Sequence, residues 1–517
     1  MSVAEKIIRN TAFNIFGRFA SLLVTLFLTP FIIRYLGLEV FSLWVVIGTL
    51  TGYFGLFDLG IANAFIKYIC EHFTRRQMDT VSEIVSTGTF FYALFALVTV
   101  AVSFAAIDFI LTIFKIPLYL RLEARWVFLV SICLFALGNI VSVFEAVPAA
   151  LQRFDILSKI TIVLSVVTAA GTIYFLKAGF GLRGLVFNNA VVLGVRTGLN
   201  LAVAYRLLPG LKLSPFLFSR QMFLKLFKFG YKLQVARWSS MLSIHFDKLL
   251  ICYFLSMGLV TYYQLGSNIV LTAVSLSLLL IPALLPAFAE IQAKGEREKL
   301  AEGYLRGTRY ISLVAIPLFI FIIITADRIV AFWMGKGFEL SVVIIRVLAP
   351  GWLLAVLCGV GGAVLQAEGK PEIEMRTSLL VAVLNVPISI LLIYRFGFMG
   401  VALGTTLSFF FAAVYFYIRL HRELQIPADH FFKTALAKIL AVCLVVGIPV
   451  WLTSVLVINI FHPEGRVWNL SILLFQAGMF FGLYLKLLPQ AGLFDDAVIT
   501  LLWEKLPFLK ICDCRAR

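Results

Sequence analysis

The sequence predicts an all-α polytopic membrane protein with about fourteen transmembrane helices. These form two parallel six-helix repeats around a central cleft, and two extra helices follow. Three observations support this class: 61% of the 517 residues are hydrophobic and only 14% are charged, long apolar blocks recur along the chain, and its two halves share an internal similarity. A soluble protein has about 25% charged residues, so lipid must solvate much of this surface.

A membrane span needs about 20 predominantly apolar residues, and fourteen blocks qualify. The predicted spans are 11–33, 40–66, 86–107, 126–150, 159–177, 183–205, 231–256, 260–288, 309–326, 341–366, 377–394, 397–418, 436–459 and 468–487. The first block is too long for a cleavable signal peptide and lacks a small-residue cleavage site, so we expect an uncleaved span.

The distribution of Lys and Arg predicts the orientation. With the N-terminus in the cytoplasm, about 29 fall on cytoplasmic segments, about 10 on the opposite side and about five inside spans. The loops 206–230 and 289–308 are both basic. We therefore expect a multi-pass protein with both termini in the cytoplasm.

The net charge of +17 lies between apolar blocks and is not gathered on a soluble face, which argues against a nucleic-acid partner. The seven cysteines show no spacing typical of a disulfide framework or metal site. Cys512 and Cys514 lie in a basic tail, where reduced thiols are the simplest expectation. The segment 495–510 is either a short amphipathic helix on the cytoplasmic leaflet or a frayed terminus.

Three pairs of matching segments are 214–219 residues apart. FGLRGLVFNNAVVL from Phe180 matches FGFMGVALGTTLSF from Phe396, Leu151–Gln152 matches Leu365–Gln366, and Arg18 matches Arg237. Six spans separate the partners, so the repeats are parallel, and two such lobes can rock about a cleft. The predicted divisions are an N-lobe at 1–222, a C-lobe at 223–430, two further helices at 431–490 and a cytoplasmic amphipathic tail at 491–517.

Inserting an ionisable side chain at the middle of a membrane costs about 2.5–3.5 kcal/mol of free energy, so each such residue requires a structural or functional explanation. Arg18, Arg237 and Lys248 come from the first and seventh spans, at equivalent positions of the two lobes. We predict that they line a cationic cleft that suits an anionic substrate, because Arg binds phosphate through paired N–H groups. Arg196 and Arg346 are further candidates for the same cleft.

Other polar groups inside spans have a structural and a functional interpretation. Asp58 and Glu145 can pair with nearby cations or reach the cytoplasmic interface. Asp247 points away from Lys248 and can pair with a neighbouring helix, while His245 is either a packed neutral side chain or a proton-coupling group. We expect no metal site, no cofactor and no catalytic residue: the Walker A, HExxH and GxSxG motifs and a channel filter sequence are all absent.

The segments NTAFNIFGRF, RYLGLEVFSLWVVIGTL and GLFDLGIANAF, between Asn10 and Phe65, resemble the polysaccharide transporter (O-antigen flippase-like) family. HFDKLLICYFLSMGLVTYYQLGSNIV from His245 and LQAEGKPEIEM from Leu365 extend the likeness over nearly the whole chain. The family belongs to the multidrug/oligosaccharidyl-lipid/polysaccharide exporter superfamily.

The resemblance implies two six-helix lobes around a central cavity. It also implies flipping of undecaprenyl-diphosphate-linked oligosaccharide in a bacterial inner membrane, for O-antigen, capsule or exopolysaccharide synthesis. Arg18 matches a cavity arginine of related lipid II flippases, and Gly37 matches the glycine after that helix. The segment from Ser21 to Pro30 offers no match for their other cavity arginines, which argues for a glycan other than the peptidoglycan precursor. A polysaccharide polymerase and a chain-length regulator are the partners to expect.

Two alternatives stay open from the sequence. A cation-coupled drug or metabolite antiporter of the same superfamily favours acidic and aromatic cavities, so Arg18, Arg237 and Lys248 count against it. A membrane glycosyltransferase or polymerase usually needs a large extracytoplasmic loop, and the loops here are short. We therefore expect a transporter and not an enzyme.

Overall fold

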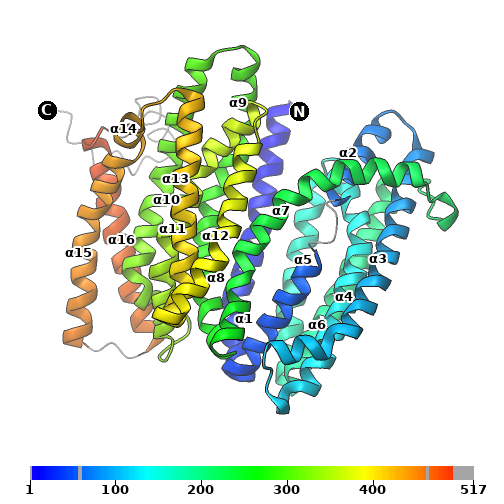
Figure 1. The fold of residues 1–517 in the computed structure, drawn as a ribbon, viewed down its shortest axis with the longest axis horizontal. Helices are drawn as coiled ribbons and strands as arrows, with labels where there is room; N and C mark the ends of the chain where they lie inside the picture. The colour runs from blue at the N-terminus through cyan, green and yellow to red at the C-terminus, as the bar shows by residue number, and fades with distance from the viewer. Residues whose placement is uncertain (1–2, 56–60, 462–464, 493–517) are drawn as a thin grey trace. The chain divides into compact units, whose positions relative to one another are not determined.

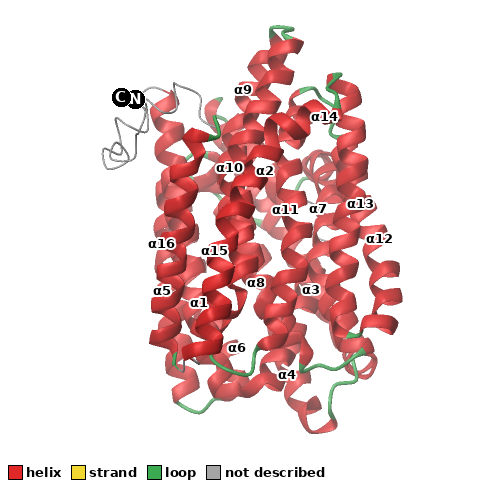
Figure 2. Cartoon of the chain, turned by 90° about the vertical axis from the view of Figure 1, so that its left-hand side faces the viewer, coloured by secondary structure: helices red, strands yellow, loops and turns green. Residues whose placement is uncertain are grey.

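The computed structural model describes the backbone of residues 3–55, 61–461 and 465–492, in which every regular segment is a helix (Figure 2). Side chains are described for 21–55, 64–228, 246–455 and 465–492, apart from positions 280, 282, 283 and 286. No strand occurs in these described segments. Asp58 and the predicted tail at 493–517 fall outside them.

The chain divides into two compact units, Met1–Thr261 and Tyr262–Arg517, here called unit 1 and unit 2. Unit 1 holds α1 (Val3–Phe54), α2 (Ile61–Thr74), α3 (Met78–Ile113), α4 (Leu118–Ala150), α5 (Phe154–Lys177), α6 (Gly181–Leu207) and α7 (Arg220–Phe254), together with a short 3-10 helix (Pro215–Leu217) (Figure 1). α8 (Leu259–Ser277) begins at its end.

Unit 2 continues with a 3-10 turn (Leu278–Leu280), α9 (Ile281–Ala293), α10 (Arg297–Trp333), α11 (Glu339–Ala367), α12 (Glu372–Phe396), α13 (Phe398–Leu424), α14 (Ala428–Phe431), a π-helical segment (Phe432–Ala437), α15 (Lys438–Phe461) and α16 (Arg466–Gln490). In the described part of the chain, eleven helices are long and apolar enough to cross a membrane.

Nearly all described residues of the fourteen predicted apolar blocks lie on these helices, and residues 56–60 are outside the described part of the chain. α1 contains the first predicted span and most of the second, and it kinks at Gly37, whose φ of 78° lies in the left-handed region. Only glycine adopts that conformation at little cost. The predicted span 260–288 is divided into α8, the 3-10 turn and α9. The real helices are often longer than the apolar runs, as in α10.

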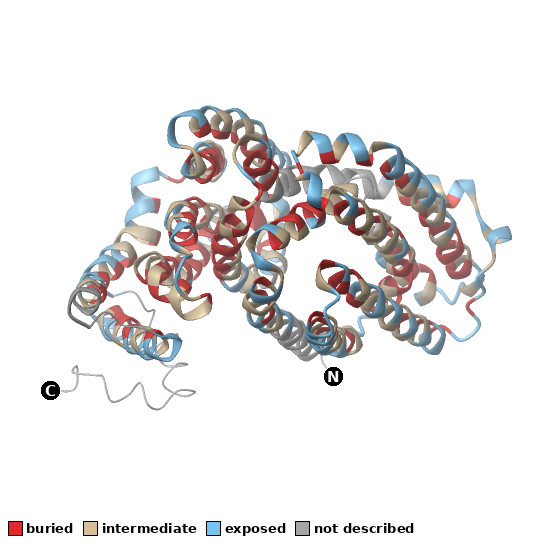
Figure 3. Cartoon of the chain, turned by 90° about the horizontal axis from the view of Figure 1, so that it is seen from below, coloured by how far each residue is buried: buried red, intermediate tan, exposed pale blue. Residues whose placement is uncertain are grey.

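The exposed apolar residues of α3 show why this fold needs lipid. Leu97, Phe104 and Phe109 are 71%, 62% and 69% exposed. Leu97 and Phe104 are seven residues apart, so they share one face of the helix. Buried and exposed positions occur on different sides of most helices (Figure 3). Such apolar outer faces suit a hydrocarbon solvent.

Two helical hairpins, α5–α6 in unit 1 and α12–α13 in unit 2, carry the repeated segments. Both second helices carry a tightly packed glycine in their first turn: a Cβ on Gly184 would lie 3.0 Å from the Phe175 side chain, and one on Gly400 would lie 2.2 Å from the Leu392 oxygen. In the first hairpin Asn188 donates a hydrogen bond of 2.9 Å to the Thr172 hydroxyl.

The second hairpin has an amide–hydroxyl bond in the opposite sense, in which Asn385 of its first helix, α12, donates to the Thr405 hydroxyl of α13 over 2.8 Å. The ends of α4 and α11 refine the alignment of the repeats. The left-handed residue that follows each helix is Gln152 (φ 55°) in unit 1 and Gly369 (φ 73°) in unit 2. Gln152 therefore corresponds to Gly369, while Gln366 lies inside α11.

The boundary between the two compact units follows Thr261. It lies later in the chain than the predicted boundary between the N-lobe and the C-lobe, which follows residue 222. α7 packs in unit 1, because its Met222 and Leu226 join a buried cluster with Phe65 and Ile84 of α2 and α3. In unit 2 a separate cluster, which includes Ile316, Val446 and Phe480, packs α15 and α16 against α10. The division into lobes by sequence repeat stays a prediction.

Candidate functional site

Two cavities lie inside unit 1, and Arg196 lines both of them. The first, here called the hydroxyl cavity, has a volume of about 370 Å³. Its polar lining comes from four helices: Ser21 and Thr25 of α1, Glu145 of α4, Thr161, Ser165 and Thr168 of α5, and Arg196 and Asn200 of α6. Serine and threonine hydroxyls make up most of this polar lining, which holds one acid and one base, and the apolar side chains of Val24, Leu157, Ile160 and Leu164 complete the wall.

The second cavity, here called the amide cavity, has a volume of about 390 Å³ and lies between α1, α4 and α6. Its polar and aromatic lining consists of Trp44, Thr51, Ser131, Asn139, Ser142, Asn189 and Arg196, with apolar side chains such as Leu134 and Phe135. Both volumes are in the range of ligand pockets, which typically combine an apolar wall with a few polar groups.

Arg196 is held by a two-pronged ion pair with Glu145. Its Nε donates to Oε1 of the carboxylate, and its Nη2 donates to Oε2 over 2.6 Å. Asn200, one helical turn further along α6, donates to Glu145 Oε1 over 3.2 Å and to the Arg196 carbonyl over 2.9 Å. The Arg196 and Glu145 side chains are 34% and 28% exposed. Paired hydrogen bonds fix the plane of a guanidinium group, so Arg196 has a defined orientation at the boundary of the two cavities.

Sequence reasoning named Glu145 and Arg196 but did not pair them. Glu145 lies on α4 and Arg196 on α6, 51 residues apart, and no local spacing connects them. The sequence predicts that Arg196 lines a cleft. In the structure its side chain bonds to Glu145 and lines the two cavities of unit 1.

Lys248 and Asp247 are both buried in α7, with exposed fractions of 5% and 1%. The Asp247 carboxylate is close enough to act electrostatically on Lys248 and on Tyr53 of α1. Lys248 is absent from the linings of the hydroxyl and amide cavities, as far as the described side chains show.

The backbones of Arg18, Arg237 and His245 lie in α1 and α7, but their side chains are outside the described set. Asp58 lies in the undescribed segment 56–60. A cleft lined by Arg18, Arg237 and Lys248 therefore stays a prediction.

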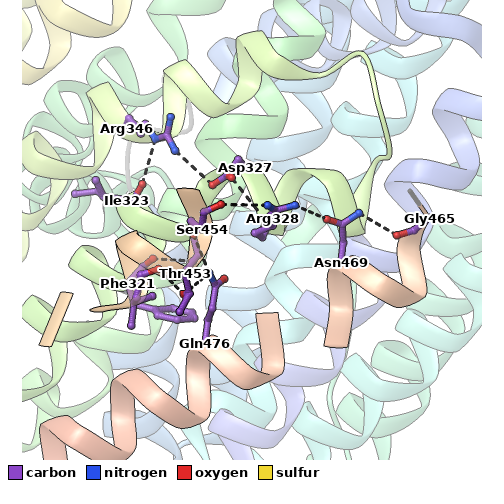
Figure 4. Close-up of polar contacts among 12 residues, drawn as sticks. Phe321, Ile323, Asp327, Arg328, Arg346, Thr453, Ser454, Gly465, Asn469 and Gln476 are labelled. Carbon is purple, nitrogen blue, oxygen red and sulfur yellow. Dashed lines mark hydrogen bonds and ion pairs between the residues drawn. The ribbon is translucent and has the colours of Figure 1, made fainter. Parts of the chain in front are cut away.

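Arg346 lies on α11 in unit 2, where its side chain is about half exposed. Its Nη2 is 3.4 Å from Asp327 Oδ1, and its Nε donates to the Ile323 carbonyl over 3.2 Å (Figure 4). Asp327 and Ile323 both belong to α10. Each unit thus contains an arginine–carboxylate pair on membrane helices, and the pair in unit 1 is the more closely bonded of the two.

Arg328, the neighbour of Asp327, is a buried charge that sequence reasoning missed. Its Nη1 donates to Asn469 Oδ1 of α16 over 3.1 Å, and its Nη2 donates to the Ser454 carbonyl of α15 over 3.5 Å (Figure 4). The predicted span stopped at residue 326, just before these charges, whereas α10 continues to Trp333. The sequence did carry one signal of this contact. Asn469 and Gln476 are seven residues apart in the last apolar block, so they share one polar face of that helix.

Solved structures with a similar fold are membrane transporters and flippases. A lipid II flippase, MurJ, matches with a TM-score of 0.70 and 16% identity over 93% of this chain and 99% of that chain. An inward-facing multidrug MATE transporter matches with a TM-score of 0.64 and 14% identity over 81% and 96%. These likenesses show the fold, and with the helical architecture they define the class: the chain is an all-α, polytopic membrane protein.

The family follows from the sequence comparisons. A family described as "Polysaccharide biosynthesis protein" matches residues 56–343, more than half of the chain. The chain belongs to this polysaccharide biosynthesis protein family. A Shigella flexneri protein whose name assigns it to O-antigen transport is 24% identical, over 77% of this chain and 94% of its own length. A Haloferax volcanii protein named as a low-salt glycan biosynthesis flippase is 25% identical over 32% of this chain and 34% of its own.

Proposed function

We propose that the protein is a flippase for undecaprenyl-diphosphate-linked oligosaccharide units. It moves them by alternating access across the bacterial cytoplasmic (inner) membrane for cell-surface polysaccharide synthesis, with both termini in the cytoplasm. The family assignment and the named roles of the relatives support this substrate class. The structural observation that carries the proposal is Arg196, held by Glu145 where two membrane-embedded cavities meet.

The physical problem for such a substrate is its diphosphate. Moving an ionised group through hydrocarbon is very costly unless paired and hydrogen-bonded groups replace its water. The Arg196 guanidinium and the hydroxyls of the hydroxyl cavity are groups that can do this. The lipid tail needs no such help, because it can stay in the bilayer during the transfer.

Glu145 has a distinct part in this scheme. An arginine that is already paired binds an incoming phosphate reversibly, because the carboxylate competes for the same N–H groups. Release matters as much as binding in a carrier, so a paired Arg196 suits transport better than an isolated charge. Arg18, Arg237 and Lys248 are the further cations that we propose for the substrate path.

The test uses the organism that carries this protein. Deleting it should remove the surface polysaccharide and leave lipid-linked oligosaccharide on the cytoplasmic leaflet. Wild-type protein should restore the polymer, Arg196→Ala should not, and Arg196→Lys should restore part of it. Thr197→Ala is the matched control, because Thr197 lies beside Arg196 on α6 and its hydroxyl donates to the Leu193 carbonyl of its own helix.

The outcomes separate the candidate functions when membrane levels of the variants are equal. If the deletion strain keeps its surface polymer and becomes sensitive to cationic drugs, the result would contradict the flippase and support the antiporter alternative. Full restoration by Arg196→Ala would remove Arg196 from the mechanism.

A further inference from the structure

We propose that Arg346 of unit 2 binds the phosphate of a lipid headgroup, at the membrane face that holds the loop between α10 and α11. In the proposed orientation this face is the outer leaflet. The site itself does not depend on the proposed function. If the bound lipid is the transported one, the inference rests on that function and extends it, because Arg346 would then receive the diphosphate on the side of release.

The first observation is that a ligand can reach the Arg346 side chain. It is 48% exposed and lies on α11 beside the end of α10 (Figure 4). Pro350, one helical turn deeper on the same face, is also exposed. An ionised side chain on an exposed face of a membrane helix needs a polar partner, because hydrocarbon offers it none.

The protein itself uses only part of the hydrogen-bonding capacity of Arg346. Its Nε donates to the Ile323 carbonyl over 3.2 Å, and its Nη2 lies 3.4 Å from Asp327 Oδ1 (Figure 4). The second distance is long for a charged hydrogen bond, which is typically about 2.7–2.9 Å. Nη1 takes part in neither contact, and a guanidinium has five N–H donors in all. Donors therefore remain for the oxygen atoms of a ligand.

The charges around Arg346 favour an anion as that ligand. Asp327 contacts two arginines, since its Oδ2 also lies 3.8 Å from Nε of Arg328. One carboxylate between two guanidinium groups leaves an excess of one positive charge in these three side chains. Arg328 is only 6% exposed, so Arg346 is the arginine that an outside anion can reach. Such an anion would balance the excess charge, which is costly at the edge of hydrocarbon.

The depth of Arg346 in the membrane helix identifies the anion. α11 has 29 residues and is about 43 Å long, close to the thickness of a bilayer with its headgroups. Arg346 is seven residues after Glu339, so it lies about 10 Å from the start of α11, near the boundary of headgroups and hydrocarbon. From there an arginine side chain can extend to the headgroup layer. Phosphates are the common anions of that layer, and a guanidinium binds them through paired N–H groups.

The test measures binding of three lipids to the purified full-length protein by native mass spectrometry: undecaprenyl diphosphate, phosphatidylglycerol and diacylglycerol, which has no phosphate. Arg346→Met should weaken binding of at least one of the two phosphate lipids by about tenfold. Asp327→Asn should strengthen it by about two- to fivefold, because the competing carboxylate charge is gone. Binding of diacylglycerol should change by less than about twofold in both variants.

The matched control is Arg395→Met. It removes an equal charge from an exposed arginine in the last turn of α12, also in unit 2. Its binding of all three lipids should match that of the wild type. A loss in Arg395→Met equal to that in Arg346→Met would overturn the site, because net charge alone would then explain the binding.

The remaining outcomes separate the sources of the phosphate. A loss of undecaprenyl diphosphate alone supports the site and assigns it to the substrate, whereas a loss of phosphatidylglycerol supports it as a site for membrane lipid. Unchanged binding of both phosphate lipids in Arg346→Met, or an equal loss of diacylglycerol, overturns it. If the wild-type protein fails to transport in vesicles while Arg346→Met loses phosphatidylglycerol, the proposed function fails and the site stands.

Discussion

Glu145 and Arg196 form a two-pronged ion pair between α4 and α6, with Nη2 of Arg196 2.6 Å from Oε2 of the carboxylate. Both side chains are about one-third exposed, so they are neither free in solvent nor sealed in the core. The pair places a cation where two cavities meet and also neutralises it.

The first prediction concerns the coupling of this pair. Arg196→Ala removes the partner of a carboxylate inside a membrane helix, so it should cost more stability than the double variant Glu145→Ala/Arg196→Ala. We expect a coupling free energy of about 1–2 kcal/mol, reduced by the partial exposure. A double-mutant cycle of thermal unfolding in detergent measures it. A coupling indistinguishable from zero would mean that the pair does not stabilise the packing of α4 against α6.

The second prediction concerns the close contact of α12 with α13. A Cβ on Gly404 would lie 2.2 Å from Ser389 Oγ and 2.6 Å from the Ser389 Cα. Backbone atoms cannot move aside cheaply, so Gly404→Ala should destabilise the protein by about 1–3 kcal/mol. Gly478→Ala in α16 is the control, because a Cβ added there would meet nothing within 4 Å and alanine favours a helix. Equal melting temperatures for the two variants would contradict this packing.

The third prediction concerns the buried Arg328. Arg328→Met should lower stability by about 1–3 kcal/mol, because Asn469 Oδ1 and the Ser454 carbonyl lose a charged donor. Arg346→Met should cost less, since the Arg346 side chain is half exposed and its contact with Asp327 is long, at 3.4 Å. Thermal unfolding of the two variants in the same detergent makes the comparison. A larger loss in Arg346→Met would refute this ranking.

The fourth prediction concerns topology. Lys299 is exposed near the start of α10, in a basic segment that the charge distribution assigns to the cytoplasm. A reporter active only in the cytoplasm should be active when fused there, and a periplasmic reporter should be silent. The opposite pattern would reverse the orientation of every helix.

The sequence predicted the helices well because the membrane imposes a simple rule. Each crossing needs a long apolar run, and such runs can be counted without knowing their neighbours. The ends were predicted less well: α10 continues past Asp327 and Arg328, because charged residues can lie inside a helix when their partners come from other helices.

The candidate site was only partly predictable. Arg196 and Glu145 were singled out because charges are rare inside spans. Their pairing, and the pairing of Arg328 with Asn469, join helices far apart in the chain, and one sequence carries no signal for such contacts. The amide cavity depends on Trp44 and Asn139 facing the same space, which apolar periodicity does not show.

The most direct test of the central claim is transport by the purified protein in vesicles. Full-length protein in proteoliposomes should move undecaprenyl-diphosphate-linked oligosaccharide, isolated from the native strain, between leaflets, as measured by an enzyme that reaches only the outer one. Arg196→Ala should slow this movement by at least about tenfold, and Thr197→Ala should not. Movement at the rate of protein-free vesicles, or equal rates for wild type and Arg196→Ala, would contradict a flippase that works through Arg196.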